Sequence, residues 1–244
     1  IDKWIKDYYY FHGIQSLVVG VSGGIDSAVV STLCAKTGLP TYAVRMPLES
    51  SHQNTRLSDL HAEQLAEKYD NVTNVQIELS SVYDSLLHSI KWWSEAQQFD
   101  KKEFTSDELA NANTKSRIRM VTLYQIAGAK KGIVVGTGNK VEDYGIGFYT
   151  KYGDGGVDIA PIADLYKTEV RELGGYLGVD ALIIDAQPTD GLWEDGRSDE
   201  DQIGATYAQL EEAMESGTGD AVDILSKFNR QNRHKMQPIP TFKL

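Results

Sequence analysis

Two hydroxyls, two glycines and a carboxylate stand together in the stretch Ser22-Gly23-Gly24-Ile25-Asp26-Ser27. An apolar run, Leu17–Val21, precedes this stretch, and a helix-like segment, Ala28–Lys36, follows it. Between a strand and a helix, glycines let backbone N–H groups approach an anion, and the helix N-terminus adds partial positive charge. The carboxylate of Asp26 is suited to hold a divalent cation on the same anion. These residues therefore predict a site for a phosphate-bearing ligand.

Other interpretations of this loop stay open. It lacks the lysine of a GxxxxGK[ST] phosphate loop and the spacing of a GxGxxG dinucleotide fingerprint. The residues Gly20–Gly24 do match the G-x-S-x-G nucleophile elbow of hydrolases, and His234 lies late in the chain, after several aspartates. That elbow needs earlier strands for its oxyanion hole, and only 21 residues precede Ser22. A serine hydrolase and a purely structural turn are the alternatives to a phosphate site.

A second group of polar residues, Gly136–Phe148, begins where the apolar run Ile133–Gly136 ends. Open α/β sheets bind their ligands at the carboxyl ends of strands. Glu142 is therefore a candidate for the second carboxylate on the cation held by Asp26, since magnesium commonly takes one or two carboxylates together with phosphate oxygens. The alternative is a glycine-rich connection with solvated acids.

Two further stretches combine residue types that suit a nucleotide. The residues Phe148–Asp158 combine aromatic rings that can stack on a base with Lys151, which can bind phosphate. They also contain acids that can accept hydrogen bonds from hydroxyl groups. The segment Pro161–Glu169 begins a helix and contains Lys167. Taken alone, an Asp-Gly-Gly sequence is an ordinary turn and a lysine at a helix start is usually solvated.

Short apolar runs alternate with helical patterns along the chain. The expected strands are Leu17–Val21, Thr41–Met46, Val75–Leu79, Ile133–Gly136 and Ala181–Ile184. The expected helices are Asp26–Lys36, Leu57–Tyr69 and Ser106–Lys130. The last has a capping box from Thr105 to Glu108. Its expected inner face consists of Leu109, Ala112, Ser116, Met120, Leu123, Tyr124 and Ala127. This alternation predicts an α/β fold with a doubly wound, Rossmann-like parallel sheet flanked by helices.

The length allows one large domain or two small ones, and we expect a single domain over residues 1–244. The residues Gln187–Asp201 are rich in Asp, Glu and Gly without periodicity, which predicts a mobile lid loop. The tail Asn229–Leu244 has two prolines and several cations. It is expected to be partly disordered or to fold back over the site.

Composition narrows the classes of partner. The formal net charge of -11 argues against a nucleic-acid surface. A single cysteine, Cys34, excludes an internal disulfide and a CxxC metal site, and its apolar helix predicts a buried, inert thiol. The sequence shows no leader and no apolar run long enough to span a membrane, so we expect a cytoplasmic protein with no membrane partner.

The stretch SGGIDS at Ser22–Ser27 is similar to the pyrophosphate loop of the N-type ATP pyrophosphatases, which cleave ATP to AMP and pyrophosphate while adenylating a substrate. Three further stretches follow it in order: GTGNKVED at 136–143, FYTKYGDGG at 148–156 and PIADLYKTEV at 161–170. Together they resemble ammonia-dependent NAD synthetase over nearly the whole chain. Glutamine-dependent relatives carry a preceding nitrilase-like domain with its own cysteine, and usually a longer GDMAGG loop, so the resemblance favours the ammonia-dependent form.

The resemblance implies a fold like that of the adenine nucleotide alpha hydrolases, and it implies roles for individual residues. ATP binding is implied for Ser22, Gly23, Gly24, Asp26, Ser27, Arg45, Thr137, Lys167 and, in the lid, Thr189. Deamido-NAD binding is implied for Tyr8, Arg117, Tyr124, Phe148, Lys151, Asp158, His234 and Lys235. The implied magnesium ligands are Asp26 and Glu142. The implied catalytic residues are Asp26, Lys167 and Asp154, the last as a proton acceptor for ammonium.

The implied reaction has two steps. ATP adenylates the nicotinate carboxylate of deamido-NAD and releases pyrophosphate, and ammonia then displaces AMP to give NAD. In the family the dinucleotide site lies at a homodimer interface. The alternatives are the synthetase domain of a glutamine-dependent enzyme, another adenylating amidotransferase or sulfur-transfer enzyme of the superfamily, an ATP sensor without turnover, and the serine hydrolase.

Overall fold

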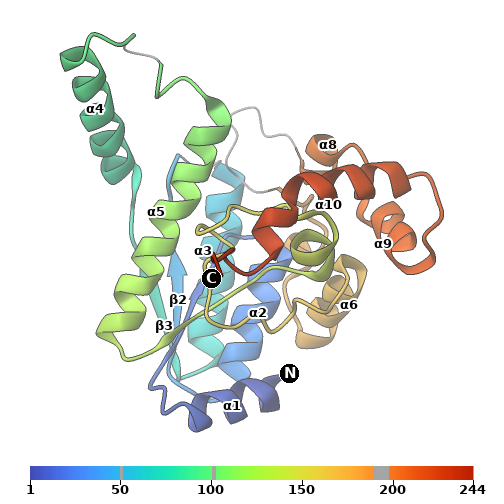
Figure 1. The fold of residues 1–244 in the computed structure, drawn as a ribbon. Coiled ribbons are helices and arrows are strands. Elements are labelled where there is room, and N and C mark those ends of the chain that lie inside the picture. The colour runs from blue at the N-terminus through green and yellow to red at the C-terminus, as the bar shows by residue number, and fades with distance from the viewer. Residues whose placement is uncertain (50–51, 101–102, 190–197, 244) are drawn as a thin grey trace.

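The computed structural model describes residues 1–49, 52–100, 103–189 and 198–243 (Figure 1). Its centre is a four-stranded sheet in the order β3-β2-β1-β4. The strands are β1 (Leu17–Gly20), β2 (Thr41–Arg45), β3 (Val72–Gln76) and β4 (Ile133–Val135), and every pairing is parallel. The expected parallel α/β sheet is confirmed.

Helices cover both faces of the sheet because side chains alternate along each strand. Leu17 and Val19 of β1 share a buried cluster with α2 (Ile25–Lys36). Val18 points the other way and packs with Ala127 of α5 (Glu108–Ala129). The remaining helices of this half are α1 (Asp2–Phe11), α3 (His52–Lys68) and α4 (Ser80–Ala96).

A second buried cluster lies beside the sheet. It contains Val141, Ile146, Tyr207 and Leu210, and it holds together the C-terminal elements seen on the right of Figure 1. These elements are the π-helix η1 (Val141–Ile146), α8 (Asp199–Ile203), α9 (Tyr207–Ser216) and α10 (Val222–Met236). Two helices, α6 (Lys167–Leu177) and α7 (Ala181–Ile184), pack against α2.

Two strand predictions need correction. Ala181–Ile184 is the short helix α7 and not a strand, because Asp180 caps it by accepting a hydrogen bond from the backbone N of Leu182. A run of four apolar residues cannot distinguish a strand from a buried helix turn. The predicted strand Val75–Leu79 is displaced, since β3 spans Val72–Gln76 and pairs with β2 along that length.

The start of α5 also differs from the prediction. Asp107, and not Thr105, is the N-cap residue, and its Oδ1 accepts a hydrogen bond of 2.7 Å from the backbone N of Ala110. Of the predicted inner face, Ala112, Ser116 and Ala127 are buried, whereas Leu109 is 60% exposed. Leu109 is the second residue of α5, at the end of the helix that extends beyond the sheet (Figure 1).

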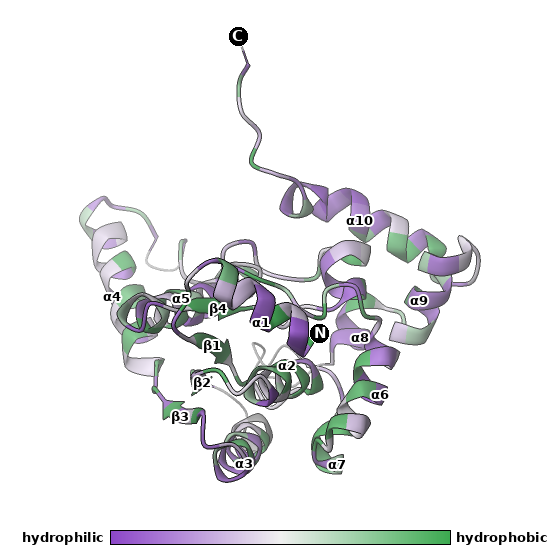
Figure 2. Cartoon of the chain, turned by 90° about the horizontal axis from the view of Figure 1, so that it is seen from below, coloured by the Kyte–Doolittle hydropathy of each residue, from purple (hydrophilic) through white to green (hydrophobic). Residues whose placement is uncertain are grey.

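The first half of the predicted tail is helical. Residues 229–236 belong to α10, and the chain after α10 runs away from the rest of the molecule (Figure 2). Most of the predicted lid, residues 190–197, lies outside the described residues. None of the described helices is both long and apolar enough to cross a membrane. Cys34 is fully buried, as predicted, and burial raises the pKa of its thiol to about 12.

Candidate active site

The loop Ser22–Ser27 turns from β1 into α2. Gly23 has φ +92°, a backbone conformation that glycine adopts without strain, and Gly24 is the N-cap residue of α2. The hydroxyl of Ser22 accepts a hydrogen bond from the backbone N of Gly24 (3.2 Å) and lies 3.0 Å from the hydroxyl of Ser27. Asp26 therefore lies in the first turn of a helix, next to backbone N–H groups that can receive an anion.

Asn139 joins the two motifs that are far apart in the sequence. This fully buried residue follows β4, and its Oδ1 accepts hydrogen bonds from the backbone N atoms of Val141 and Glu142, both 3.1 Å. Its Nδ2 donates to Asp26 Oδ1 at 3.3 Å. One amide thus fixes the start of η1, which carries Glu142, and also contacts the carboxylate at the start of α2.

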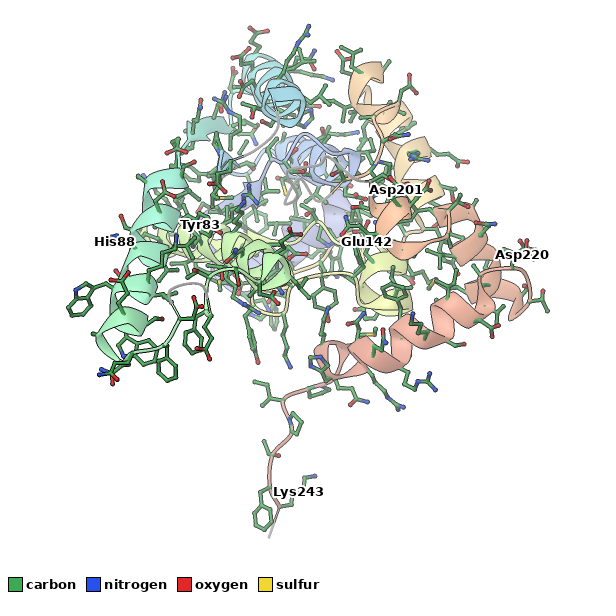
Figure 3. The ribbon with its side chains drawn as sticks, turned by 90° about the horizontal axis from the view of Figure 1, so that it is seen from above. Tyr83, His88, Glu142, Asp201, Asp220 and Lys243 are labelled. Atoms are coloured by element: carbon green, nitrogen blue, oxygen red, sulfur yellow. The ribbon has the colours of Figure 1, made fainter. Side chains whose placement is uncertain are left out.

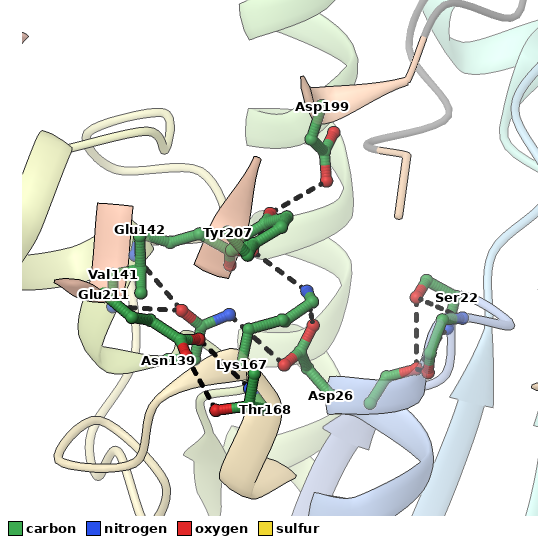
Figure 4. A network of polar contacts seen from close by, with 12 residues as sticks. Ser22, Asp26, Asn139, Val141, Glu142, Lys167, Thr168, Asp199, Tyr207 and Glu211 are labelled. Atoms are coloured by element: carbon green, nitrogen blue, oxygen red, sulfur yellow. Dashed lines mark hydrogen bonds and ion pairs between the residues drawn. The ribbon is translucent and has the colours of Figure 1, made fainter. Parts of the chain in front are cut away.

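Lys167 completes a charged network at this point (Figure 4). It is the first residue of α6 and is 2% exposed. Its Nζ lies 2.5 Å from Asp26 Oδ2 and 3.0 Å from Glu142 Oε1. The site lies at the carboxyl ends of the neighbouring strands β1 and β4. The next strand in the sequence after β1 is β2, which lies on the opposite side of β1 from β4. This is the point of a doubly wound sheet where ligands bind.

The electrostatics of the network keep the lysine charged and raise the pKa of Asp26 and of Asp143. Burial alone would lower the pKa of Lys167, but the carboxylates of Asp26 and Glu142 raise it, so the ammonium stays charged. Burial also raises the pKa of Asp26, and the charge of Lys167 acts against that rise. Burial, with the charge of Glu142 beside it, raises the pKa of Asp143 to about 7.

Tyr207 and Asp199 belong to the site, and the sequence analysis missed both. Tyr207 Oη donates to Glu142 Oε1 at 2.6 Å and lies 3.2 Å from Asp199 Oδ2. Burial raises the pKa of Tyr207, and the charges of Glu142 and Asp199 raise it further. The one local signal in the sequence was the capping box from Thr206 to Gln209, which marks the start of a helix but no chemistry.

Asp154 lies in a second polar group, on the loop that faces α5. Its Oδ1 accepts hydrogen bonds from Ser116 Oγ (2.7 Å) and from the backbone N of Thr150 (3.0 Å). The surrounding protein raises the pKa of Asp154, and these two hydrogen bonds oppose the rise. Gly153 fits closely here, since an added Cβ would lie 2.3 Å from Ser116 Oγ.

The structure brings together most residues predicted for deamido-NAD. Arg117 Nε donates to the backbone O of Lys151 at 3.4 Å, and Tyr124 Oη donates to Asp158 Oδ1 at 3.1 Å. Asp158 also accepts from the backbone N of Val134 at 2.7 Å, which ties this loop to β4. One side of α5 therefore meets the segment 151–158 in two places.

The C-terminal pair lies against the same loop. Lys151 Nζ donates to the backbone O of His234 at 3.0 Å. Lys235 Nζ donates to the backbone O atoms of Gly147 (2.9 Å) and Tyr149 (2.8 Å), and burial lowers the pKa of Lys235. Phe148, between these two carbonyls, packs on the second buried cluster. The tail thus folds back on the loop through α10.

Four predicted residues have no described hydrogen bond to the charged network around Lys167 or to the second polar group around Asp154. Tyr8 lies on α1, at the foot of the sheet in Figure 1, with its ring centroid 4.3 Å from that of His12. Arg45 ends β2 and is engaged by Asn74 and Asp59. Thr137 lies two residues after the end of β4, and Thr189 immediately precedes the undescribed residues 190–197.

The hydrolase alternative finds no support in this geometry. Among the described residues, the hydroxyl of Ser22 is hydrogen-bonded within its own loop and has no histidine partner. His234 instead contributes its backbone O to Lys151. Ser22 therefore lacks the base that a serine nucleophile requires.

Asp26 and Glu142 have the chemistry that magnesium prefers. Both carry oxygen ligands, both contact the same ammonium, and the loop beside them can hold a phosphate group whose oxygens would complete the coordination. Within the described part of the chain, no cluster of three or more acidic, histidine or cysteine residues forms a metal cage. Two carboxylates match a cation that is held mainly by a nucleotide.

The parallel sheet and the anion-binding loop at its switch point define a nucleotide-binding α/β protein. Comparison with known proteins identifies its family. The NAD synthase family matches residues 1–239. The NH(3)-dependent NAD(+) synthetase of Finegoldia magna is 34% identical over 99% of this chain and 93% of its own length. The chain belongs to the NAD synthase family, and it is a ligase of that type.

Solved structures agree with this assignment. NMN synthetase from Francisella tularensis superposes on this chain with a TM-score of 0.88 at 33% sequence identity. The superposition covers 100% of this chain and 95% of the synthetase chain. The NH3-dependent NAD synthetase of Campylobacter jejuni gives a TM-score of 0.74 at 25% identity, with 99% and 95% covered.

Proposed function

We propose that this chain makes NAD by ATP-dependent amidation of deamido-NAD with ammonia, releasing AMP and pyrophosphate. The observation that carries the proposal is the network of Asp26, Glu142 and Lys167 beside the loop Ser22–Ser27. The family match supports the same activity. The glutamine-dependent alternative is less favoured, because curated relatives that share 34% and 37% identity with this chain are named NH(3)-dependent NAD(+) synthetase.

The first half-reaction needs stabilisation of the departing pyrophosphate. In this proposal the N-terminus of α2 and the backbone of Gly23 and Gly24 hold the β- and γ-phosphates of ATP. Lys167 moves from the carboxylates toward the phosphates and neutralises their charge. Asp26 and Glu142 would hold magnesium, which would supply additional positive charge beside the same phosphates. The chain mainly positions two polyanions and offsets their repulsion.

The second half-reaction needs free ammonia beside the acyl-adenylate. Asp154 accepts a proton from ammonium, and Ser116 and Thr150 hold its carboxylate in place. Deamido-NAD lies along α5 and the loop 148–158, where Arg117, Lys151 and Lys235 supply positive charge. The lid 187–201, with Thr189, keeps water from the acyl-adenylate.

A homodimer fits two features of the surface. Trp93, Phe99 and Phe104 form an exposed aromatic cluster at the end of α4, with ring centroids 5.5–5.7 Å apart. A second copy of the chain would cover this cluster. The second feature is Tyr8, which lies on α1 away from both polar groups of its own chain, so a role at the dinucleotide site would be at the site of a neighbouring subunit. Sedimentation should show a dimer, and Trp93→Glu should shift it toward monomer.

The test of the adenylation step is isotope exchange. With deamido-NAD present and ammonium absent, labelled pyrophosphate should enter ATP, because the acyl-adenylate forms reversibly. Omission of deamido-NAD should abolish the exchange. An ATP sensor without turnover predicts no exchange under either condition.

A second candidate substrate is nicotinate mononucleotide, the acid that corresponds to NMN. It is favoured by one observation: the NMN synthetase of Francisella tularensis superposes better than the Campylobacter jejuni NAD synthetase, with TM-scores of 0.88 and 0.74. The ratio of kcat/KM for deamido-NAD and for nicotinate mononucleotide, measured with one enzyme preparation, decides between the two. A preference for the dinucleotide supports the proposed function.

A further inference from the structure

Tyr207 is held rigidly at the start of α9. It is 2% exposed and packs in the buried cluster that also contains Val141, Ile146 and Leu210. The capping box at Thr206 fixes the first turn of its helix, and its own backbone N donates to Glu200 Oε1 at 3.0 Å. Its ring therefore has little freedom to move relative to η1 and α6.

This one ring contacts two charged groups of the phosphate site (Figure 4). The Nζ of Lys167 lies 4.8 Å from the ring centroid, a cation–π distance. At the edge of the ring, Oη donates to Glu142 Oε1 at 2.6 Å. Figure 3 labels Glu142 in the view from above, and Tyr207 and Lys167 are both 2% exposed, so the contact between ring and ammonium is made away from bulk solvent.

The hydroxyl has a function that packing does not explain. A phenylalanine would fill the same apolar position, but it would leave Glu142 without its shortest hydrogen bond. Among the described residues, both hydrogen bonds to the Glu142 side chain, from Tyr207 and Lys167, end on Oε1. The other oxygen, Oε2, accepts no hydrogen bond from the described residues, so it is the oxygen left available to a cation.

We propose that Tyr207 is a positioning residue for the cation site: its hydroxyl orients Glu142 so that Oε2 can bind the cation, and its ring supports the ammonium of Lys167. The inference rests on the proposed function, which assigns Glu142 to the metal. Tyr207 also connects the C-terminal helices to the phosphate site, because it belongs to α9 and donates a hydrogen bond to Glu142.

The test is the binding of Mn²⁺, followed by its EPR signal, to the full chain with α,β-methylene-ATP, an analogue that cannot be cleaved at the bond that breaks. Tyr207→Phe keeps the ring and removes the hydroxyl. Loss of a partner that orients a metal ligand typically weakens metal affinity by about tenfold or more, and we expect that loss here. The thermal midpoint should stay close to that of the unchanged protein.

Tyr9→Phe is the matched control, since Tyr9 is a buried tyrosine of α1 in the other cluster. It should leave Mn²⁺ affinity unchanged. Tyr207→Leu removes the ring as well and should weaken binding of the nucleotide analogue in addition to Mn²⁺. Should the leucine variant fail to fold, the phenylalanine variant alone decides.

Unchanged Mn²⁺ affinity in Tyr207→Phe would overturn the inference, and so would a lowered thermal midpoint without a change in affinity. Absence of Mn²⁺ binding to the unchanged protein would also overturn it. Failure of the proposed function looks different: the unchanged protein would then bind Mn²⁺ and the analogue, and Tyr207→Phe would weaken binding, but no NAD would form.

Discussion

Lys167 Nζ lies 2.5 Å from Asp26 Oδ2, although the two residues are 141 positions apart in the chain. Asp26 comes from the first turn of α2 and Lys167 from the first residue of α6. The fold thus brings two helix N-termini and one ammonium to the same point, which concentrates positive potential where ATP phosphates are expected. Glu142, also in contact with Lys167, makes the lysine a counter-ion for two carboxylates.

Lys167→Met should therefore lower stability as well as remove activity. The variant leaves Asp26 and Glu142, both mostly buried, without their cation, and breaking a buried ion pair costs about 3 kcal/mol or more. Magnesium should raise the thermal midpoint of the variant more than that of the unchanged protein, because it supplies the missing charge. Calorimetry with and without magnesium measures both effects.

Lys140→Met is the control for this substitution. Lys140 pairs with Asp164 at 3.2 Å, but both side chains are exposed, at 31% and 97%, so the pair should contribute little to stability. Equal midpoints for the Lys167→Met variant and the unchanged protein, with equal responses to magnesium, would show that Lys167 does not neutralise the carboxylates.

Ser116→Ala should weaken the second half-reaction. Ser116 Oγ donates to Asp154 Oδ1 and accepts from the backbone N of Asp154 at 2.9 Å, so its loss frees the carboxylate. A hydrogen bond to a charged group is worth up to a few kcal/mol when buried, and for this exposed carboxylate we expect kcat to fall by about tenfold. The pKa of Asp154 should rise, which shifts the acidic limb of the pH profile upward.

Thr114→Ala is the matched control on α5, because its hydroxyl bonds only within the helix, to the backbone O of Ala110. The pH dependence of kcat should be measured at saturating ammonia for both variants. Superimposable profiles for Ser116→Ala and the unchanged protein would remove Asp154 as the proton acceptor.

We expect the protein to lose stability in mild acid because His61 is buried in its neutral form. The residue is 3% exposed, its Nε2 lies 2.9 Å from Ser31 Oγ, and burial lowers its pKa from 6.5 to about 4. The unfolded chain binds a proton near pH 6.5 and the folded chain does not until about pH 4. Stability should thus be complete above pH 6.5 and decline toward pH 4, by about 2 kcal/mol at pH 5.

Urea unfolding at pH 7.5 and pH 5 checks this expectation. His61→Gln should lose about 2 kcal/mol less than the unchanged protein between these two pH values. His88→Gln, at an exposed position on α4 (Figure 3), should keep the original pH dependence. The same loss in all three proteins would show that His61 does not carry the effect.

The sequence predicted those parts of the fold whose signals are local. The apolar runs at Leu17 and Ile133 became β1 and β4, and the glycine loop lies at the start of α2 as expected. The prediction failed at Ala181–Ile184, because a short apolar run looks alike in a strand and in a helix turn. The glycines and the carboxylate of Ser22–Ser27 are local signals, so they indicate a phosphate loop without knowledge of the rest of the fold.

The polar partners within the site could not be predicted in the same way. Asn139 and Tyr207 acquire their roles only through contacts with Asp26 and Glu142, which depend on how distant elements pack. Around Tyr207 the sequence shows an ordinary helix start, and nothing local distinguishes this tyrosine from a core residue. Arg45, in contrast, was assigned to ATP by resemblance, and the structure shows it engaged with Asn74 and Asp59.

The most direct measurement of the central claim is product formation by the full chain with ATP, magnesium, deamido-NAD and ammonium. We predict NAD and AMP in equal amounts, with rates that rise with ammonium, and no product from Asp26→Asn, which keeps the size of the side chain but removes its charge. A folded protein that forms no NAD at any ammonium concentration would contradict the account, and so would an Asp26→Asn variant with near-normal turnover.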